Sequence, residues 1–153
     1  MIRSTRSPLR PRSRGFTLIE LVLVMIIVAV IASIAAPRFA QANARQQLDA
    51  AARRIASDLE KAQIQARASS NTVSIKFTEN QDSYTFTPAV GSSFIVELDE
   101  RPYQVEIIKV SLGGTDTVTF NGFGVPDTSG VLTLGSSVGQ STVTLDATGS
   151  VSR

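Results

Sequence analysis

Glu20 is the only charged residue in the apolar run from Phe16 to Ala36. As an α-helix, that run would span about 30 Å, the thickness of the hydrocarbon core of a bilayer. A carboxylate inside such a span costs about 2.5 to 3.5 kcal/mol near the bilayer centre and less near an end. Glu20 therefore requires a cationic partner, and the chemistry available to this segment is charge pairing in apolar surroundings.

The rest of the chain offers little catalytic chemistry. It contains no cysteine and no histidine, which excludes disulfides, metal sites built from thiolates or imidazoles, and catalytic triads that use either residue. Asp99 and Glu100 adjoin Arg101, but a charged β-turn explains this cluster. Loop oxygens can bind calcium without a fixed spacing, and no pattern here indicates such a site. We expect no enzyme, no cofactor and no metal.

Two ordinary explanations of the apolar run compete. A secretory signal peptide could be cleaved after Ser33-Ile34-Ala35, before Ala36 and Pro37, which would release a secreted β-domain. However, Glu20 would interrupt its apolar core, and the run is as long as or longer than the usual ~7 to 15 residues. A plain uncleaved anchor explains the length but leaves Glu20 without a partner.

A third interpretation rests on residues 14–21, which read Arg-Gly-Phe-Thr-Leu-Ile-Glu-Leu. The combination of a glycine, an aromatic residue, a carboxylate four residues later and an apolar span resembles the type III signal of type IV pilins and type II secretion pseudopilins. The resemblance implies that prepilin peptidase cuts between Gly15 and Phe16 and methylates the new amine of Phe16. It also implies that Glu20 engages the N-terminal amine of the next subunit during assembly.

Cleavage after Gly15 would supply the cation that Glu20 lacks. An ammonium on Phe16 would lie four residues before Glu20, a spacing that places two residues on one helix face, within one chain or between neighbours. Residues 1–15 form a basic leader without acidic residues, and its arginines are Arg3, Arg6, Arg10, Arg12 and Arg14. Removing them changes the net charge from +2 to −3, with 10 basic and 13 acidic residues. Arginines beside an apolar span keep that end cytoplasmic.

Residues 16–37 are expected to form a transmembrane helix, and residues 38–70 an amphipathic helix that continues it. Pro37 should kink the helix without necessarily ending it, because proline removes one backbone hydrogen bond. The second helix carries one apolar stripe in steps of three or four residues: Ala44, Leu48, Ala51, Ile55, Leu59, Ala62 and Ala66. We expect this stripe to cover a β-sheet, with the charged residues, including Asp58, largely off it.

Residues 71–153 show the alternation typical of β-strands. A polar turn between residues 72–77 and the pair Tyr84 and Phe86 predicts a hairpin. Further strands are predicted at residues 94–98, 104–111, 117–120, 131–134 and 142–145, with a short one near Val151. The expected fold class is α+β and pilin-like, with a long N-terminal helix packed on a mainly antiparallel β-sheet.

Two segments, residues 118–124 and 143–151, resemble the glycine-turn patterns of H-type minor pseudopilins and related minor pilins, the GspH/FimT-like group. The residues themselves also support a structural interpretation, in which Phe120 and Phe123 are core or edge residues and the glycines occupy turns with positive φ. In many relatives a basic residue follows the last turn. Here Ser150 occupies that place, so we carry no function over to this turn.

The resemblance implies a minor subunit that is assembled into a type II secretion pseudopilus for protein export. Its implied partners are prepilin peptidase, other pseudopilins or pilins, an inner-membrane assembly platform and membrane lipid. The implied location is the bacterial inner membrane, crossed once with a periplasmic C-terminal domain, and then a periplasmic fibre. The alternatives are a minor pilin of a type IV pilus, for motility or DNA uptake, and a secreted β-domain. Nucleic acid is not an expected partner, because acidic residues outnumber basic ones beyond residue 70.

Overall fold

The structure is a computed structural model that describes residues 15–153. The predicted basic leader therefore lies, except for Gly15, outside the described residues. A single helix, α1, runs from Leu18 to Ser69, and Pro37 lies inside it. The chain divides into two compact units, one that ends at Arg38 and one that covers Phe39–Arg153. The kink predicted at Pro37 stays a prediction.

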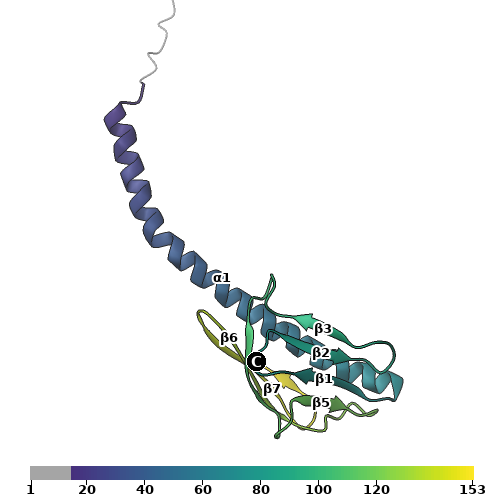
Figure 1. Cartoon of the computed structure of the whole chain (residues 1–153). Coiled ribbons are helices and arrows are strands. Elements are labelled where there is room, and N and C mark those ends of the chain that lie inside the picture. Colours follow the sequence, from purple (N-terminus) through teal and green to yellow (C-terminus); the bar gives the residue numbers. More distant parts are fainter. Residues whose placement is uncertain (1–14) are drawn as a thin grey trace, which may run out of the picture. The chain divides into compact units, whose positions relative to one another are not determined.

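Eight strands follow α1 and form two antiparallel sheets, which we name sheets A and B (Figure 1). Sheet A has the order β3-β2-β1-β5, and its strands are β1 (Val73–Phe77), β2 (Ser83–Thr87), β3 (Phe94–Glu97) and β5 (Thr117–Phe120). Sheet B has the order β4-β6-β7-β8, and its strands are β4 (Glu106–Ser111), β6 (Gly130–Ser136), β7 (Gly139–Leu145) and β8 (Val151–Ser152).

Each strand expected from the alternating pattern lies at or near its predicted position, and β1 pairs with β2 as the predicted hairpin. The α+β fold with antiparallel strands is therefore confirmed. The expectation of one sheet needs correction, because β4 pairs with β6 while β5 returns to pair with β1. Pairing between strands so far apart in the chain is not encoded in a local alternation.

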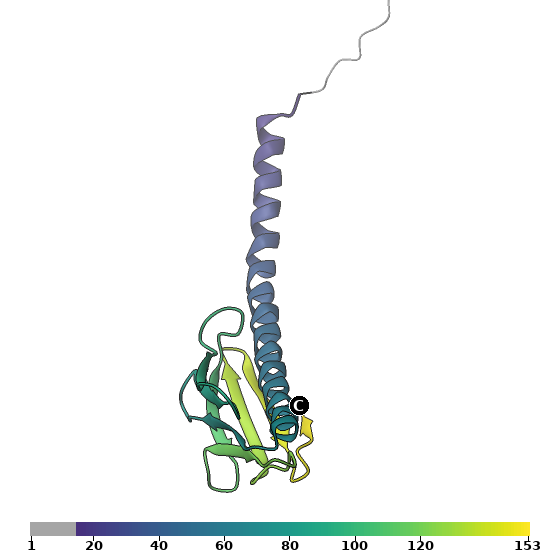
Figure 2. The ribbon, with the colours of Figure 1, turned by 90° about the vertical axis from the view of Figure 1, so that its right-hand side faces the viewer.

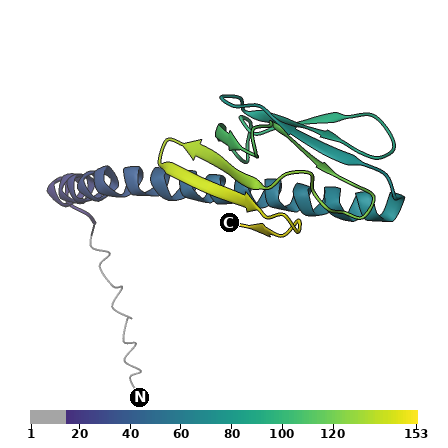
Figure 3. The same ribbon diagram turned by 90° about the horizontal axis from the view of Figure 1, so that it is seen from below.

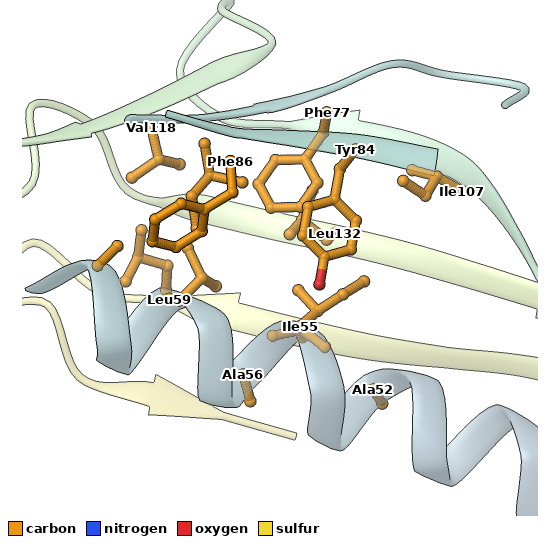
Figure 4. Packing of buried hydrophobic residues seen from close by; sticks show 14 of the residues in the cluster. Ala52, Ile55, Ala56, Leu59, Phe77, Tyr84, Phe86, Ile107, Val118 and Leu132 are labelled. Atoms are coloured by element: carbon orange, nitrogen blue, oxygen red, sulfur yellow. The ribbon is translucent and has the colours of Figure 1, made fainter. Parts of the chain in front are cut away.

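The core lies between the second half of α1 and the inner faces of both sheets (Figures 2 and 4). Ile55 and Leu59 are fully buried among Phe77, Tyr84 and Leu132. The predicted stripe is buried from Leu48 to Ala66, whereas Ala44 is only partly covered. Each large apolar side chain buried in this way stabilises the fold by about 1.5 to 3 kcal/mol.

Asp58 is the one buried charged residue in the described part of the chain, although its sequence position places it beside the apolar stripe. Its Oδ2 accepts a hydrogen bond of 2.6 Å from the Tyr84 hydroxyl on β2 and one of 3.0 Å from Arg54 Nε. Burial, followed by the hydrogen bond to Asp58, raises the pKa of Tyr84 well above its ordinary value. The triad of Arg54, Asp58 and Tyr84 thus satisfies a charge inside the core.

Replacing Tyr84 by phenylalanine should lower the free energy of unfolding by about 1 to 3 kcal/mol, because it leaves a buried carboxylate oxygen with one donor fewer. Urea unfolding of the full chain in detergent micelles would measure this loss. Tyr103→Phe is the matched control, since the Tyr103 hydroxyl forms no hydrogen bond within residues 15–153. Equal effects of the two substitutions would contradict a stabilising role for the triad.

Candidate functional site

The N-terminus of α1 is capped by Thr17. Its Oγ1 accepts a hydrogen bond of 3.2 Å from the backbone N–H of Glu20, and its carbonyl accepts one of 3.1 Å from Leu21 N–H. The sequence Thr17-Leu18-Ile19-Glu20 fits the capping-box pattern, which is the signal from which this cap could have been predicted. The cap starts the helix at Leu18 and leaves Gly15 and Phe16 in front of it. It also places Glu20 in the first turn, where the helix dipole favours a carboxylate.

The first part of α1 exposes apolar side chains around its whole circumference. Its most apolar stretch has a mean hydropathy of 3.0 and is not buried at all within the structure. Leu18 is 80% exposed and Ile19 is 74% exposed, and Phe16, just before α1, is 77% exposed. By length and composition, this helix can cross a membrane. A helix that is apolar all round requires apolar surroundings, either lipid or other helices.

Glu20 has no cation within reach among residues 15–153. The salt bridges in this part of the chain lie elsewhere, at Arg53–Asp49, Arg54–Asp58 and Lys76–Asp116. The predicted site residues Gly15, Phe16 and Glu20 thus lie together at the start of α1, as their nearness in the sequence requires. Pro37 lies apart from them, inside α1.

Two turns in the globular unit have the same hydrogen-bonding pattern, although they are far apart in the sequence. In the turn that starts at Asn121, Oδ1 of Asn121 accepts from the N–H groups two and four residues later. In the turn that starts at Asp146, Oδ1 of Asp146 accepts from the corresponding two N–H groups. The fourth residue of each turn is a glycine in the left-handed region, Gly124 at φ 72° and Gly149 at φ 86°. The structural interpretation of these glycines is therefore confirmed.

Both turns attach to the C-terminal end of α1. Gln63 Nε2 donates to the carbonyl of Gly124 at 2.9 Å and, more weakly, to that of Thr148 at 3.4 Å. Arg67 Nε donates to the carbonyl of Phe123 at 3.0 Å. A Cβ atom at either glycine would overlap one of these helix side chains. The glycines are thus needed for close approach to α1 as well as for backbone conformation.

Exposed carboxylates of the domain stabilise turns. A hydrogen bond from the Thr148 hydroxyl, followed by one from Ser150 N–H, lowers the pKa of Asp146. The Thr117 hydroxyl has the main lowering effect on the pKa of Asp116. In the part of the chain that the structure describes, no three carboxylates lie close enough together to hold a metal ion. These groups are accounted for by local structure.

Comparison with known families agrees with this geometry. The family model for the prokaryotic N-terminal methylation motif matches residues 10–36, which contain the capped helix start and the apolar stem. The model for type II transport protein GspH matches residues 51–149, from the buried face of α1 to the second glycine turn. The chain belongs to the GspH family. This GspH-family chain is therefore a minor pseudopilin or pilin, a structural subunit of the kind that prepilin peptidase processes and that assembles into fibres with other pilins.

A crystal structure supports the fold. The GspH-family chain is similar to the type IV minor pilin FimU of Pseudomonas aeruginosa strain PAO1, with a TM-score of 0.51 and 15% sequence identity. The match covers 71% of this chain and 88% of FimU, and at this identity it shows a shared pilin-like fold. A search of curated protein sequences found no match.

Substituting Gly149 by alanine should destabilise the domain more than the same change at Gly114. The two glycines have nearly equal φ angles, 86° and 91°, so an added Cβ strains the backbone similarly. Nothing lies within 4 Å of the Cβ position at Gly114, whereas at Gly149 it meets Gln63. We expect an additional loss of about 1 kcal/mol at Gly149, measured by urea unfolding of the full chains, because the hydrogen bonds of Gln63 are displaced. Equal losses would show that the contact with α1 adds no stability.

Proposed function

We propose that this chain is a minor pseudopilin of a type II secretion pseudopilus, a periplasmic fibre that serves protein export. Prepilin peptidase cuts between Gly15 and Phe16 and methylates the amine of Phe16. The chain crosses the inner membrane once, with its N-terminus in the cytoplasm and its domain in the periplasm. An inner-membrane assembly platform then moves it into the fibre. The observation that carries this proposal is Glu20, a carboxylate without a salt-bridge partner among residues 15–153, at the start of an exposed apolar stem.

The helix cap favours a charge pair between subunits over one within a chain. Because Thr17 ends the helix on its N-terminal side, Phe16 lies before α1 and its amine is not held on the helix face that carries Glu20. Parallel stems displaced by four residues, about 6 Å along the axis, would place the ammonium of one chain beside Glu20 of the next. In apolar surroundings such a pair is stronger than in water, because the effective dielectric constant is lower. Glu20 would thereby set the axial register of the fibre.

The similarity to FimU is one of fold alone, so it does not favour a type IV pilus over a secretion pseudopilus. Beyond Ser70, nine acidic residues outnumber the basic ones, which are Lys76, Arg101, Lys109 and Arg153. Binding to nucleic acid depends chiefly on cationic contacts to phosphates. The charge of the domain therefore favours protein export over DNA uptake.

Mass spectrometry of the protein from membranes should give an N-terminal peptide that begins with methylated Phe16. A Gly15→Val chain should retain the leader, because the resemblance places the scissile bond directly after the glycine. Pro8→Val, a change inside the leader, is the matched control and should still be processed. A mature chain that begins at Ala36 would instead identify a cleaved signal peptide and a secreted domain.

The Glu20→Gln chain should be processed normally but incorporated into fibres at least tenfold less than wild type. The substitution keeps the size of the side chain and removes the charge, so the loss of one ion pair worth about 1.4 kcal/mol in the stem suffices for that factor. Quantitative immunoblots of purified fibres and membranes give the ratio. Glu100→Gln, in an exposed turn of the domain, is the control and should incorporate as wild type. Normal incorporation of Glu20→Gln would contradict the charge pair.

A further inference from the structure

The outer strands of both sheets differ in how their free edges are protected. Exposed edges present unpaired backbone groups, and proteins usually cover, shorten or charge them. The outer edge of β5 is covered by the following segment, since Asp127 N–H donates to Thr119 O at 2.9 Å and Asp127 Oδ1 accepts from Thr119 N–H at 2.8 Å. That edge is therefore closed by the chain itself.

Sheet B is protected at both edges as well. The turn before β2 covers β4: Asn80 N–H donates to Ile107 O at 2.8 Å, and Ile107 N–H donates to Gln81 O at 3.0 Å. Glu79 Oε1 accepts a further hydrogen bond of 2.8 Å from Val110 N–H. At the opposite edge, β8 has only two residues. A strand that short offers little backbone for pairing.

Within residues 15–153 no other segment covers the outer edge of β3, and Glu97 is the one charged residue on this strand (Figure 1). Its register with β2 is continuous from Ser83↔Glu97 to Phe86↔Phe94, without a bulge. Leu98 N–H bonds to Asp82 O at 2.5 Å, and hydrogen-bonded pairs alternate along an antiparallel ladder. The alternation directs the backbone N–H and C=O of Ile95 and Glu97 away from β2, toward the open side.

Three of the four side chains of β3 are apolar, and the fourth is the exposed carboxylate of Glu97 at the end of the strand. Ile95 is 62% exposed on the outer face, and Phe94 is 41% exposed on the inner face, where it stacks on Phe86 at 5.1 Å between ring centroids. Lys61 of α1 lies over the same Phe86 ring at 5.6 Å. Ile64, which is exposed, is the one apolar residue that lines a hollow of about 520 Å³ on α1, together with Ser57, Glu60, Lys61 and Gln65. A strand added next to β3 would thus meet Phe94 on the inner face, and Ile95 together with Glu97 on the outer face.

We infer that β3 is an interaction edge that accepts an extended strand from a different pilin-like subunit of the fibre, with apolar side chains at alternating positions. The inference rests on the proposed function, because that function makes neighbouring stems parallel. A two-fold pairing of β3 with β3 of a second copy would be antiparallel and would reverse α1 in that copy, since α1 lies along the face of the same sheet. Strand addition takes its affinity from main-chain hydrogen bonds and its specificity from alternate side chains.

The test is the incorporation of full-length Ile95→Pro into fibres, in cells that assemble them. Proline removes the outward N–H of residue 95 and leaves the ladder to β2 intact, a position at which edge strands tolerate it. We expect normal processing, an unfolding midpoint near that of wild type, and a 2- to 10-fold lower ratio of fibre-bound to membrane-bound chain, the factor expected for one lost hydrogen bond. Ile95→Thr keeps the N–H and is the matched control, with a smaller loss.

Equal incorporation of Ile95→Pro and wild type would overturn the inference, as would an equal loss in Ile95→Pro and Ile95→Thr, which would point to the side chain alone. Because the chain has no cysteine, oxidation of full-length Ile95→Cys reports directly on self-pairing. A disulfide-linked dimer would place a second copy on this edge and overturn the choice of partner, whereas its absence supports a different subunit. If wild type itself never enters fibres, the proposed function fails, and that result is separate from any effect at residue 95.

Discussion

The packing of one face of α1 against two sheets holds the globular unit together. Ala51 and Ala62 let the helix backbone approach the strands closely, while Ile55 and Leu59 fill the space between them. The inner faces of sheets A and B belong to one buried cluster, and α1 is a member of it along most of its second half. In Figure 3, β6 and β7 run beside α1, with the C-terminus nearby. Without this helix face, the apolar sides of both sheets would be open to water.

The main polar contacts of the domain with α1 reinforce the same packing. Asp58 connects α1 to β2 through Tyr84, in the middle of the buried face. Gln63 and Arg67 connect the end of α1 to the two glycine turns, which follow β5 and β7. A buried polar group is tolerated only where partners satisfy it. These contacts therefore fix the position of the helix along the strands, which apolar packing alone specifies less sharply.

The two parts of α1 meet opposite requirements. The second half of α1 buries its apolar face against the two sheets of its own chain. The first part exposes its apolar side chains and also carries Glu20, which no other residue among 15–153 neutralises. Among residues 15–153 nothing covers the apolar surface of the stem or neutralises Glu20, so in the proposed fibre lipid and other subunits would do so. The open edge of β3 extends this dependence to the globular unit. For a fibre subunit, such unsatisfied surfaces are where assembly gains its free energy.

The sequence by itself determined the membrane-compatible stem, the glycine–aromatic start with Glu20, the amphipathic second half of α1 and the order of the strands. These features depend on residue type and short-range periodicity, which act within one or two turns of the chain. Only the tertiary structure decided that the strands divide into two sheets and that Asp58 is buried beside Tyr84. It also decided that the turns at Asn121 and Asp146 meet at Gln63, and that β3 alone keeps an open edge within residues 15–153. Each of these depends on contacts between residues far apart in the chain, and such pairings are selected by the burial of the whole core and not by any local pattern.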